Sequence, residues 1–478
     1  MNLHDLFAIP LRRSPERLAL RFPGADFTYA ALFSEVRRLA AGLQARGVGR
    51  GDRVAFFLGN RPEFVTAYLA VVSLGAVMVP MNLAYRRREI VHILKDAEPR
   101  LLLTERSQLP VVEELEPSER IDTVLVEEME RGEPSSPLPH AVDSDDLAMI
   151  LYTSGTTGRS KGAMITHGNV LATVTGLLAA WAWEPADVLL LTLPLFHTHG
   201  LVVGLHCALA AGATVLLRRK FDAAETAREL LSGEPTLFFG VPTMYVRLVE
   251  ELRKSGGKPS LRLFCSGSAP LSAETFAAFR ELTGQDILER YGMTETGMSL
   301  SNPYAGPRLP GTVGTPLPGV SARIADGELQ VHGSHVFPGY WRDPEKTAAS
   351  FVHDELGRRW FRTGDLARRD PETGHYTLLG RSHELILRGG FNVYPREIEE
   401  VLVSYPGIRE AAVAGRPHPD LGEVPVAFLV VDSPLDEAAL LSWCREQMAG
   451  FKIPHEIRYC DALPRNALGK VQKHLLTE

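Results

Sequence analysis

The sequence has few cysteines, and no apolar run in it is clearly long enough to cross a membrane. Its four cysteines are scattered without a CxxC pair or a metal-ligand spacing, which argues against a disulfide framework and predicts free thiols in a reducing compartment. The longest apolar run covers residues 201–217 and is interrupted by glycine and histidine. Because this length is at the short edge of a bilayer span, we expect a buried helix followed by a strand. No secretory or transit signal is evident at the N-terminus, so we expect a cytoplasmic protein without a membrane span.

The charge of the chain is also nearly balanced. A formal net charge of -7 provides no global attraction to nucleic acid or anionic lipid, so polyanion binding is disfavoured. A length of 478 residues exceeds one typical core and suggests two or more domains. The sequence leaves open whether the protein is a monomer or a homodimer.

Helical and strand-like segments alternate through the first part of the chain. Helical periodicity over residues 27–47 is followed by a short apolar strand at 54–58, and the alternation continues beyond it. This pattern predicts parallel sheets covered by helices, and hence an α/β fold. From Gly311 the sequence pattern changes to short strands and Pro/Gly turns. We therefore expect a large N-terminal domain over residues 1–380, which includes this β-rich section, and a small α+β C-terminal domain over residues 381–478.

A segment rich in glycine and hydroxyl groups, TSGTTGRSKG at 153–162, follows an apolar strand. Glycines bring backbone N–H groups against an anion, and the hydroxyls and Lys161 add donors. The segment is therefore typical of a loop that holds the phosphates of a nucleotide, with a flexible surface loop as the plain alternative. Its spacing does not match a P-loop, which needs a lysine followed by serine or threonine. An ordinary P-loop NTPase is disfavoured.

The same string resembles the signature of the adenylate-forming superfamily, which includes acyl-CoA synthetases, peptide-synthetase adenylation domains and luciferases. The resemblance extends from end to end of the chain. It implies a large N-terminal domain with the acyl and nucleotide sites and a small mobile C-terminal domain. Ser160 departs from the signature, which usually has proline there. In this loop the resemblance implies a set of ATP-binding residues: Thr153, Ser154, Gly155, Thr156, Thr157, Gly158 and Lys161.

A second motif, ERYGMTETG at 289–297, combines an aromatic ring, a hydroxyl and a carboxylate. An aromatic face can stack on adenine, Thr294 can donate to phosphate, and Glu295 offers the hard oxygen ligand that Mg²⁺ favours. A turn capped by threonine and glutamate is the structural alternative. The string resembles the family's YGxTE motif, which implies catalytic roles for Thr294 and Glu295, with Thr156 and Glu295 as magnesium ligands. The other nucleotide contacts that it implies are Glu289, Tyr291, Gly292 and Met293.

A third motif, SGSAPLS at 266–272, directly follows an apolar strand. Its glycine therefore lies at the carboxyl end of a strand, where α/β sheets bind ligands. An N-cap at Ser272 for the next helix is compatible with this role. By resemblance the acyl pocket is lined by Ser266 and Gly267, and the nucleotide is contacted by Ser268, Ala269 and Pro270.

Two motifs toward the C-terminus complete the nucleotide site by resemblance. In FRTGDL at 361–366 the resemblance implies that Asp365 binds the ribose hydroxyls with help from Arg381, although a lone aspartate in a turn is usually a turn former. In PRNALGKVQK at 464–473, Lys470 matches the catalytic lysine of the family. A lysine there would bridge carboxylate and α-phosphate oxygens as negative charge builds.

The resemblance also assigns a hinge, a thiol tunnel and an acyl contact. His383 occupies the hinge position, where aspartate or lysine is commoner, and hinges absorb backbone changes between states. His197 in PLFHTHGL would lie beside the acyl carboxylate, whereas we expect His199 to be structural. Zinc at this pair is disfavoured, because no further ligands are nearby. The tunnel for the pantetheine arm of coenzyme A would be lined by Gly389, Gly390 and Phe391.

Arg290 stands where synthetases for apolar acids generally have a small or neutral residue. A guanidinium buried beside the acyl site needs an anion, and a second substrate carboxylate would supply it in a planar two-point contact. A salt bridge with Glu289 or another acid is the alternative. With the neighbouring motifs, this segment resembles the malonyl-CoA synthetase branch, which implies malonate or methylmalonate as substrate. Arg247 could add a second anion ligand, although a helix surface is its plainer place.

The implied reaction is ATP-dependent formation of an acyl-CoA through an acyl-adenylate. Pyrophosphate and AMP are released, and Mg²⁺ and coenzyme A are required. Three alternatives stay open: activation of another short or medium-chain acid, loading of a carrier protein, or luciferase-like use of oxygen. A nucleotide sensor without catalysis is disfavoured, because the sequence retains Glu295, Asp365, Arg381 and Lys470.

Overall fold

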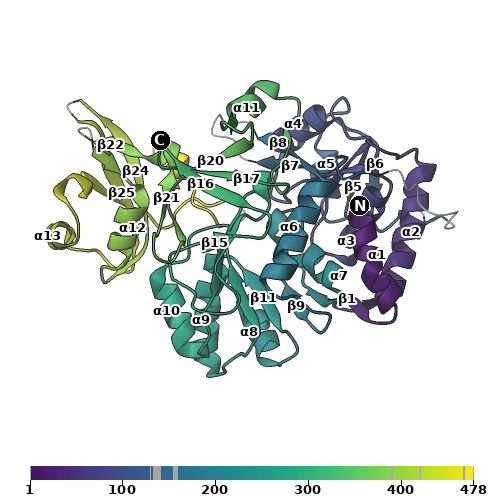
Figure 1. The fold of residues 1–478 in the computed structure, drawn as a ribbon, viewed down its shortest axis with the longest axis horizontal. Helices are drawn as coiled ribbons and strands as arrows, with labels where there is room; N and C mark the ends of the chain where they lie inside the picture. Colours follow the sequence, from purple (N-terminus) through teal and green to yellow (C-terminus); the bar gives the residue numbers. More distant parts are fainter. Residues whose placement is uncertain are drawn as a thin grey trace. The chain divides into compact units, whose positions relative to one another are not determined.

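The fold is described from a computed structural model. It describes residues 2–129, 131–132, 142–153, 160–388, 391–419, 421–466 and 469–476, without the side chains of His383 and Asn392. The chain divides into two compact units (Figure 1). The first unit comprises residues 1–310, 314–321 and 331–361, and the second comprises 311–313, 322–330 and 362–478. The domain boundary expected at Arg381 remains a prediction, because the extent of two compact units does not locate a hinge.

The first unit contains a nine-stranded sheet with the order β15-β14-β13-β12-β11-β9-β10-β1-β2. Its strands from β13 to β1 run parallel. They are short apolar segments, as expected where both faces of a parallel sheet are covered. Their bounds are β1 Leu18–Phe22, β2 Ala25–Thr28, β9 Val188–Leu191, β10 Thr214–Leu217, β11 Leu237–Gly240, β12 Leu263–Ser266, β13 Leu288–Tyr291, β14 Leu300–Ser301 and β15 Thr315–Pro316.

Three helices cover one face of this sheet: α8 (Ala223–Leu231), α9 (Pro242–Ser255) and α10 (Ala273–Thr283). They lie together beside β9 and β11 (Figure 1). Phe238 and Phe264 of the sheet form one buried cluster with Tyr245 of α9 and Phe279 of α10. The cluster anchors the strands whose carboxyl ends carry the predicted site residues.

A seven-stranded sheet has the order β18-β8-β7-β4-β3-β5-β6. Its outer face packs against α4 (Arg87–Ala97) and α5 (Leu109–Glu113), through Ile90, Ile93 and Val112. Strand β7 pairs antiparallel with β8. The bounds are β3 Arg53–Phe57, β4 Val77–Pro80, β5 Leu101–Thr104, β6 Thr123–Leu125, β7 Leu147–Thr153, β8 Lys161–Thr166 and β18 Gly339–Tyr340.

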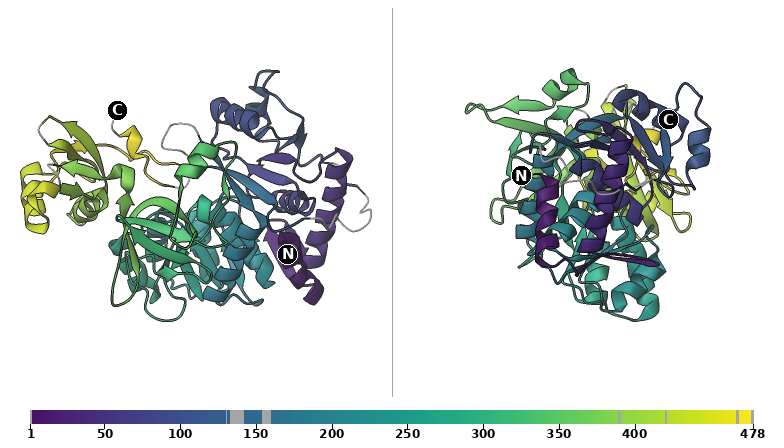
Figure 2. Two further views of the ribbon diagram at one scale, coloured as in Figure 1. Left: turned by 45° about the horizontal axis from the view of Figure 1, so that its top comes forward. Right: turned by 90° about the vertical axis from the view of Figure 1, so that its right-hand side faces the viewer.

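Buried helices connect the two sheets. Helix α6 (His167–Ala180) contacts β8 of one sheet, and the π-helix η1 (His199–His206) contacts β9 of the other. The apolar run at 201–217 forms most of η1, then α7 (Cys207–Ala211) and β10, so the expected buried helix and strand are confirmed. Around them lie α1 (Leu3–Arg13), α2 (Tyr29–Ala45) and α3 (Pro62–Ser73), and Figure 2 shows α1 and α2 side by side.

The second unit is built mainly on a sheet of order β23-β22-β25-β24, with β26 paired to β25. Helices α12 (Pro395–Val403) and α13 (Glu437–Gln447) pack on it through Ile398, Leu402, Leu440 and Cys444. The strand bounds are β22 Ile386–Arg388, β23 Phe391–Val393, β24 Ile408–His418, β25 Gly422–Val431 and β26 Glu456–Tyr459.

The β-rich section forms a further sheet, of order β16-β17-β20-β19 with β21 paired to β20. These strands are β16 Ser321–Ala325, β17 Glu328–His332, β19 Phe351–His353, β20 Arg359–Arg369 and β21 Tyr376–Arg381. The remaining short helices are η2 Thr294–Thr296, α11 Pro344–Ala349, η3 Ser382–Glu384, η4 Gly450–Lys452 and η5 Lys473–Leu475. The expected α/β fold, with an α+β C-terminal part, is confirmed.

Candidate active site

The carboxyl ends of β12 and β13 place two of the predicted motifs side by side. Cys265 pairs with Leu288 and Ser266 with Glu289 in parallel register. Ser266 ends β12 and Tyr291 ends β13, so the segments that follow both strands leave the same edge of the sheet. This is the edge at which α/β sheets bind ligands.

Arg290 of β13 is almost fully buried at this edge, with 4% of its surface exposed. Its Nε and Nη2 have no hydrogen-bond partner among the residues that the structure describes. The guanidinium packs over Gly267, where an added Cβ would overlap it. The pKa of Arg290 is lowered by burial, and the opposing effects of Cys265 and Tyr245 do not outweigh this. Successive strand side chains point to opposite faces, so Glu289 does not supply the missing partner.

One of the two histidines of the PLFHTHGL segment, His199, lies near this guanidinium. His199 is buried at the start of η1, its Nδ1 lies 3.3 Å from Ser268 Oγ, and its Nε2 has no partner in the described part of the chain. Burial lowers the pKa of His199 well below 6.5, and the charges of Arg290 and His197 lower it further. His197 is half-buried, and burial lowers its pKa to about 4. Both rings are therefore neutral at pH 7. Sequence reasoning singled out His197 alone, because no pattern showed that η1 brings His199 beside Arg290.

The turn after β13 holds a second buried polar group. The Glu295 side chain accepts a hydrogen bond from the Tyr340 hydroxyl at 3.1 Å, and the Glu295 backbone carbonyl accepts one from Phe337 N–H at 2.9 Å. Thr294 lines a small hollow of about 10 Å³ together with Thr173, Thr198 and His335, which is about the space of one water. Tyr340 carried no signal in the sequence, because it joins the site only through the pairing of β18 with β8.

Tyr291, Gly292 and Met293 lie in the same turn. The Tyr291 ring is buried, with its hydroxyl 3.8 Å from Met293 Sδ. An added Cβ at Gly292 would overlap the carbonyl oxygen of Gly297, so only glycine fits that close approach. Ala269 and Pro270 lie in the loop before α10, and Ser272 N-caps this helix, as expected.

Part of the predicted phosphate loop, from Ser154 to Arg159, lies outside the described residues. Both its ends are described: Thr153 ends β7 and pairs with Lys161 at the start of β8. Lys161 Nζ lies 3.1 Å from Asp343 Oδ2. Asp343 also N-caps α11 through Lys346 N–H, and this hydrogen bond, followed by Lys161, lowers the pKa of Asp343. A partly exposed ion pair of this kind contributes little, so a phosphate group can replace the carboxylate at Lys161.

In the second unit the structure brings Asp365 and Arg381 together. They lie opposite each other on β20 and β21, with Arg381 Nε 2.9 Å from Asp365 Oδ1. Arg381 also donates to the Thr363 carbonyl at 3.0 Å, and Asp365 N–H donates to Thr363 Oγ1 at 3.1 Å. Gly364 has a left-handed backbone (φ 71°), a conformation that glycine adopts without strain.

Lys470 lies in the electrostatic field of this pair. Surrounding protein lowers the pKa of Lys470, the charge of Arg381 lowers it further, and Asp365 and Glu384 raise it. Its backbone N–H donates to Asn466 Oδ1 at 3.0 Å, and its carbonyl accepts from Asn466 N–H at 2.9 Å. The lysine ammonium, the guanidinium and the carboxylate that the sequence predicted for one site therefore lie near one another within the second unit.

A nearby ion-pair network was not foreseen. Lys473 Nζ lies 2.6 Å from Glu399 Oε1 and 3.3 Å from Glu384 Oε2. Burial acts to lower the pKa of Lys473, but the two carboxylates outweigh it and the pKa is raised. The network ties the C-terminal segment to α12 and to η3, the turn that contains His383. No spacing in the sequence indicates contacts between residues so far apart.

Of the predicted coenzyme A contacts, Gly389 and Gly390 lie outside the described residues, as does the side chain of the predicted hinge residue His383. Phe391 is more than half exposed in β23, and its ring stacks on Phe451 at 4.7 Å between centroids. An exposed aromatic ring of this kind can pack against a narrow ligand arm.

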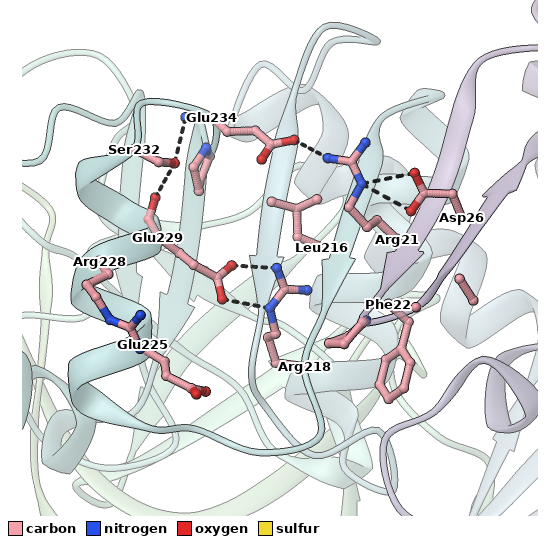
Figure 3. A pocket seen from close by; sticks show the side chains of 14 residues that line it. Arg21, Phe22, Asp26, Leu216, Arg218, Glu225, Arg228, Glu229, Ser232 and Glu234 are labelled. Atoms are coloured by element: carbon pink, nitrogen blue, oxygen red, sulfur yellow. Dashed lines mark hydrogen bonds and ion pairs between the residues drawn. The ribbon is translucent and has the colours of Figure 1, made fainter.

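A separate cleft of about 790 Å³ lies beside α8 and the strands β1 and β10 (Figure 3). Arg218 donates to both carboxylate oxygens of Glu229, and Arg21 is paired with Asp26 and Glu234. Three strands, β12, β11 and β9, separate β10 from β13. These arginines already have carboxylate partners, unlike Arg290, so the cleft is not a candidate for the acyl site.

In the described part of the chain, no helix is both long and apolar enough to cross a membrane. The same residues contain no group of three or more histidine, cysteine, aspartate or glutamate side chains arranged to hold a metal ion.

Comparisons with known proteins identify the family of the chain. Residues 7–341 match the AMP-binding enzyme family, and residues 397–470 match the AMP-binding enzyme C-terminal domain. The mitochondrial malonate–CoA ligase of Mus musculus is 35% identical, over 96% of this chain and 88% of its own length. A feruloyl-CoA synthase from an Amycolatopsis species is also 35% identical, over 99% of this chain and 98% of its own length.

Solved structures extend the comparison. The crystal structure of ATP-bound MatB from Rhodopseudomonas palustris is 40% identical and superposes with a TM-score of 0.92, over 100% of this chain and 98% of that one. The chain belongs to the AMP-binding enzyme family of adenylate-forming enzymes, as an AMP-forming acid–CoA ligase.

Proposed function

We propose that this enzyme converts malonate to malonyl-CoA, with methylmalonate as the next best substrate. The observation that carries the proposal is Arg290, a buried guanidinium with two N–H groups that lack partners in the described structure. A buried charge without a counter-ion is costly. A substrate with a second carboxylate removes that cost, because a carboxylate accepts two parallel hydrogen bonds from a guanidinium.

The comparisons support the proposal without distinguishing malonate from every other acid. The Mus musculus relative acts on malonate, whereas the Amycolatopsis relative acts on ferulate. Both have the same sequence identity to this chain, 35%. Ferulate carries its charge only on the carboxylate that reacts. The choice between the two kinds of acid therefore depends on whether a cationic side chain faces the far end of the acyl group.

In the reaction that we propose, the near carboxylate of malonate attacks the α-phosphate of ATP, and pyrophosphate leaves. Lys161 and the hydroxyls of its loop bind the departing phosphates, and Asp365 with Arg381 binds the ribose. Lys470 donates to the oxygens on which negative charge builds. The thiol of coenzyme A then attacks the acyl-adenylate and releases AMP, after the part that carries Lys470 has turned about His383.

Magnesium fits this scheme as a partner of ATP. Mg²⁺ is usually held by one or two carboxylates together with phosphates and water. The carboxylate of Glu295 is buried and accepts from Tyr340, so it is oriented as such a ligand requires. We propose Glu295 and Thr156 of the phosphate loop as the protein ligands. An ion held there would supply charge neutralisation on the phosphates of ATP.

The test is a pyrophosphate-release screen of purified enzyme with ATP and Mg²⁺. The acids are acetate, propionate, butyrate, octanoate, malonate, methylmalonate and succinate, each with and without coenzyme A. We expect malonate to have the highest kcat/KM, and acetate to be strongly rejected because it leaves the guanidinium unpaired. A faster reaction with acetate or octanoate than with malonate would overturn the proposal.

The acceptor is tested in the same assay. We expect thioester formation with free coenzyme A, detected by chromatography as malonyl-CoA. If a phosphopantetheinylated carrier protein accepted the acyl group and free coenzyme A did not, the enzyme would be a carrier-protein ligase instead.

A further inference from the structure

Arg290 is not the only buried polar group at the end of β13 that lacks a partner. His199 Nε2 and Ser266 Oγ also have none in the described part of the chain, and both residues are nearly inaccessible to solvent. Ser266 directly precedes Gly267, over which the guanidinium packs, and Ser268, which directly follows Gly267, has its hydroxyl 3.3 Å from His199. Buried polar atoms are hydrogen-bonded in nearly all cases, so several such atoms at one place indicate a missing polar ligand.

The geometry of His199 determines which of its ring nitrogens faces that ligand. Nδ1 is engaged with Ser268 Oγ at 3.3 Å. The other nitrogen, Nε2, is on the far side of the ring. When the serine hydroxyl donates to Nδ1, the proton of the neutral ring is on Nε2, which is then a hydrogen-bond donor.

Ser268 holds its hydroxyl in place at a conformational cost. Its backbone is in the left-handed region, with φ 71°, which is a strained conformation for a non-glycine residue. Glycine would adopt this conformation freely. The hydroxyl that glycine lacks is the group that contacts His199.

We propose that His199 is a second ligand of the distal substrate carboxylate: it donates from Nε2 to one carboxylate oxygen while Arg290 binds the carboxylate through its guanidinium, and Ser268 sets the tautomer. This inference rests on the proposed malonate activity. It assigns His199 to recognition of the acid, whereas the sequence suggested a structural role. Because His199 is neutral, one positive charge meets one negative charge, and no excess charge is left buried.

The decisive variants are His199→Phe, His199→Gln and His199→Asn. A glutamine amide reaches the position of Nε2, whereas an asparagine amide reaches only that of Nδ1. We expect His199→Phe and His199→Asn to raise the KM for malonate by about tenfold to hundredfold, the range for a hydrogen bond to a charged group. The kcat and the KM for ATP should change little, since the lost contact is made equally in ground and transition states. His199→Gln should retain most of the affinity.

The matched control is His206→Phe. His206 ends the same π-helix, is fully buried and has both ring nitrogens without partners in the described structure, but it stacks on Tyr68 at 5.3 Å rather than facing Arg290. The His206→Phe variant should leave the KM for malonate unchanged. Ser268→Ala, a smaller change that preserves the histidine, should raise this KM several-fold. It keeps the inference testable if His199→Phe does not fold.

Binding is also measured without turnover, as the malonate-induced rise in melting temperature. The wild type should be stabilised by malonate, and His199→Phe much less. If the wild type does not prefer malonate, the proposed function is wrong. If the wild type prefers malonate and Arg290→Met abolishes that preference, yet the His199 and Ser268 variants keep the wild-type KM, the proposed function stands and this inference is wrong.

Discussion

Replacing Arg290 by methionine is expected to make the protein more stable and to remove its preference for malonate. Arg290 is 4% exposed, and its Nε and Nη2 lack partners among the described residues. A buried guanidinium in this state keeps the desolvation cost of a charge without the compensating attraction of a counter-ion. An apolar side chain of similar length has no such cost.

The size of both effects follows from this burial. Exchanging buried ionic groups for apolar side chains of similar volume is neutral or stabilises proteins by about 1–4 kcal/mol, and the missing counter-ion places Arg290 toward the stabilising end. Removing one partner of a buried charge pair costs about 2–5 kcal/mol of binding. This corresponds to a loss of roughly 30-fold to several-thousand-fold in affinity. The variant should therefore melt at a higher temperature and lose most of its kcat/KM for malonate.

The assay combines thermal unfolding, with and without malonate, and pyrophosphate release. Arg218→Met is the matched control, because Arg218 donates to Glu229 at 2.7 and 2.6 Å in the cleft of Figure 3. Its loss should lower stability and leave the kinetics with malonate unchanged. If Arg290→Met melted below the wild type and still preferred malonate, Arg290 would have a structural partner and the reasoning would be refuted.

Three further outcomes are expected. Gly267→Ala should displace the Arg290 guanidinium and raise the KM for malonate at least tenfold. The control Gly49→Ala should leave this KM unchanged, because its Cβ would come no closer than 4.0 Å to Asp52. Equal KM values for the two variants would contradict the packing of Arg290 over Gly267. Lys470→Ala should slow adenylation by about 100- to 1000-fold but still convert a preformed acyl-adenylate to the thioester. In an assay that measures the two steps separately, equal loss of both would exclude Lys470 as the residue that serves adenylation alone. His206 is buried and uncharged, with its pKa lowered by burial from 6.5 to about 3. The unfolded chain therefore binds a proton between these pH values while the folded chain does not, and stability falls as pH drops below 6.5, by about 1.4 kcal/mol per unit. His206→Phe should reduce the loss in melting temperature between pH 7 and pH 5, and an unchanged loss would show that this residue is not responsible.

Much of the fold was predictable because its signals are local. The apolar strands β9 to β13 and the amphipathic helices between them follow from hydrophobic periodicity, and the turn at Gly292 follows from the residues that compose it. Boundaries were less certain. The composition of the run at 201–217 indicates that it is buried. It does not indicate that His199–His206, which include the start of the run, form a π-helix, because that choice depends on packing between two sheets.

The sequence by itself determined the class of enzyme and its candidate residues, because the chemistry of phosphate and carboxylate binding needs particular side chains at short, fixed spacings. Only the tertiary structure decided which of these side chains lack partners. Arg218 and Arg290 are the same residue type, but one folds against Glu229 and the other against Gly267. His199 joins Arg290 because η1 and β13 meet in space, although 91 residues separate them in the sequence. Burial and pairing are properties of the packed chain, and in this protein they distinguish a surface ion pair from a site that needs a second carboxylate.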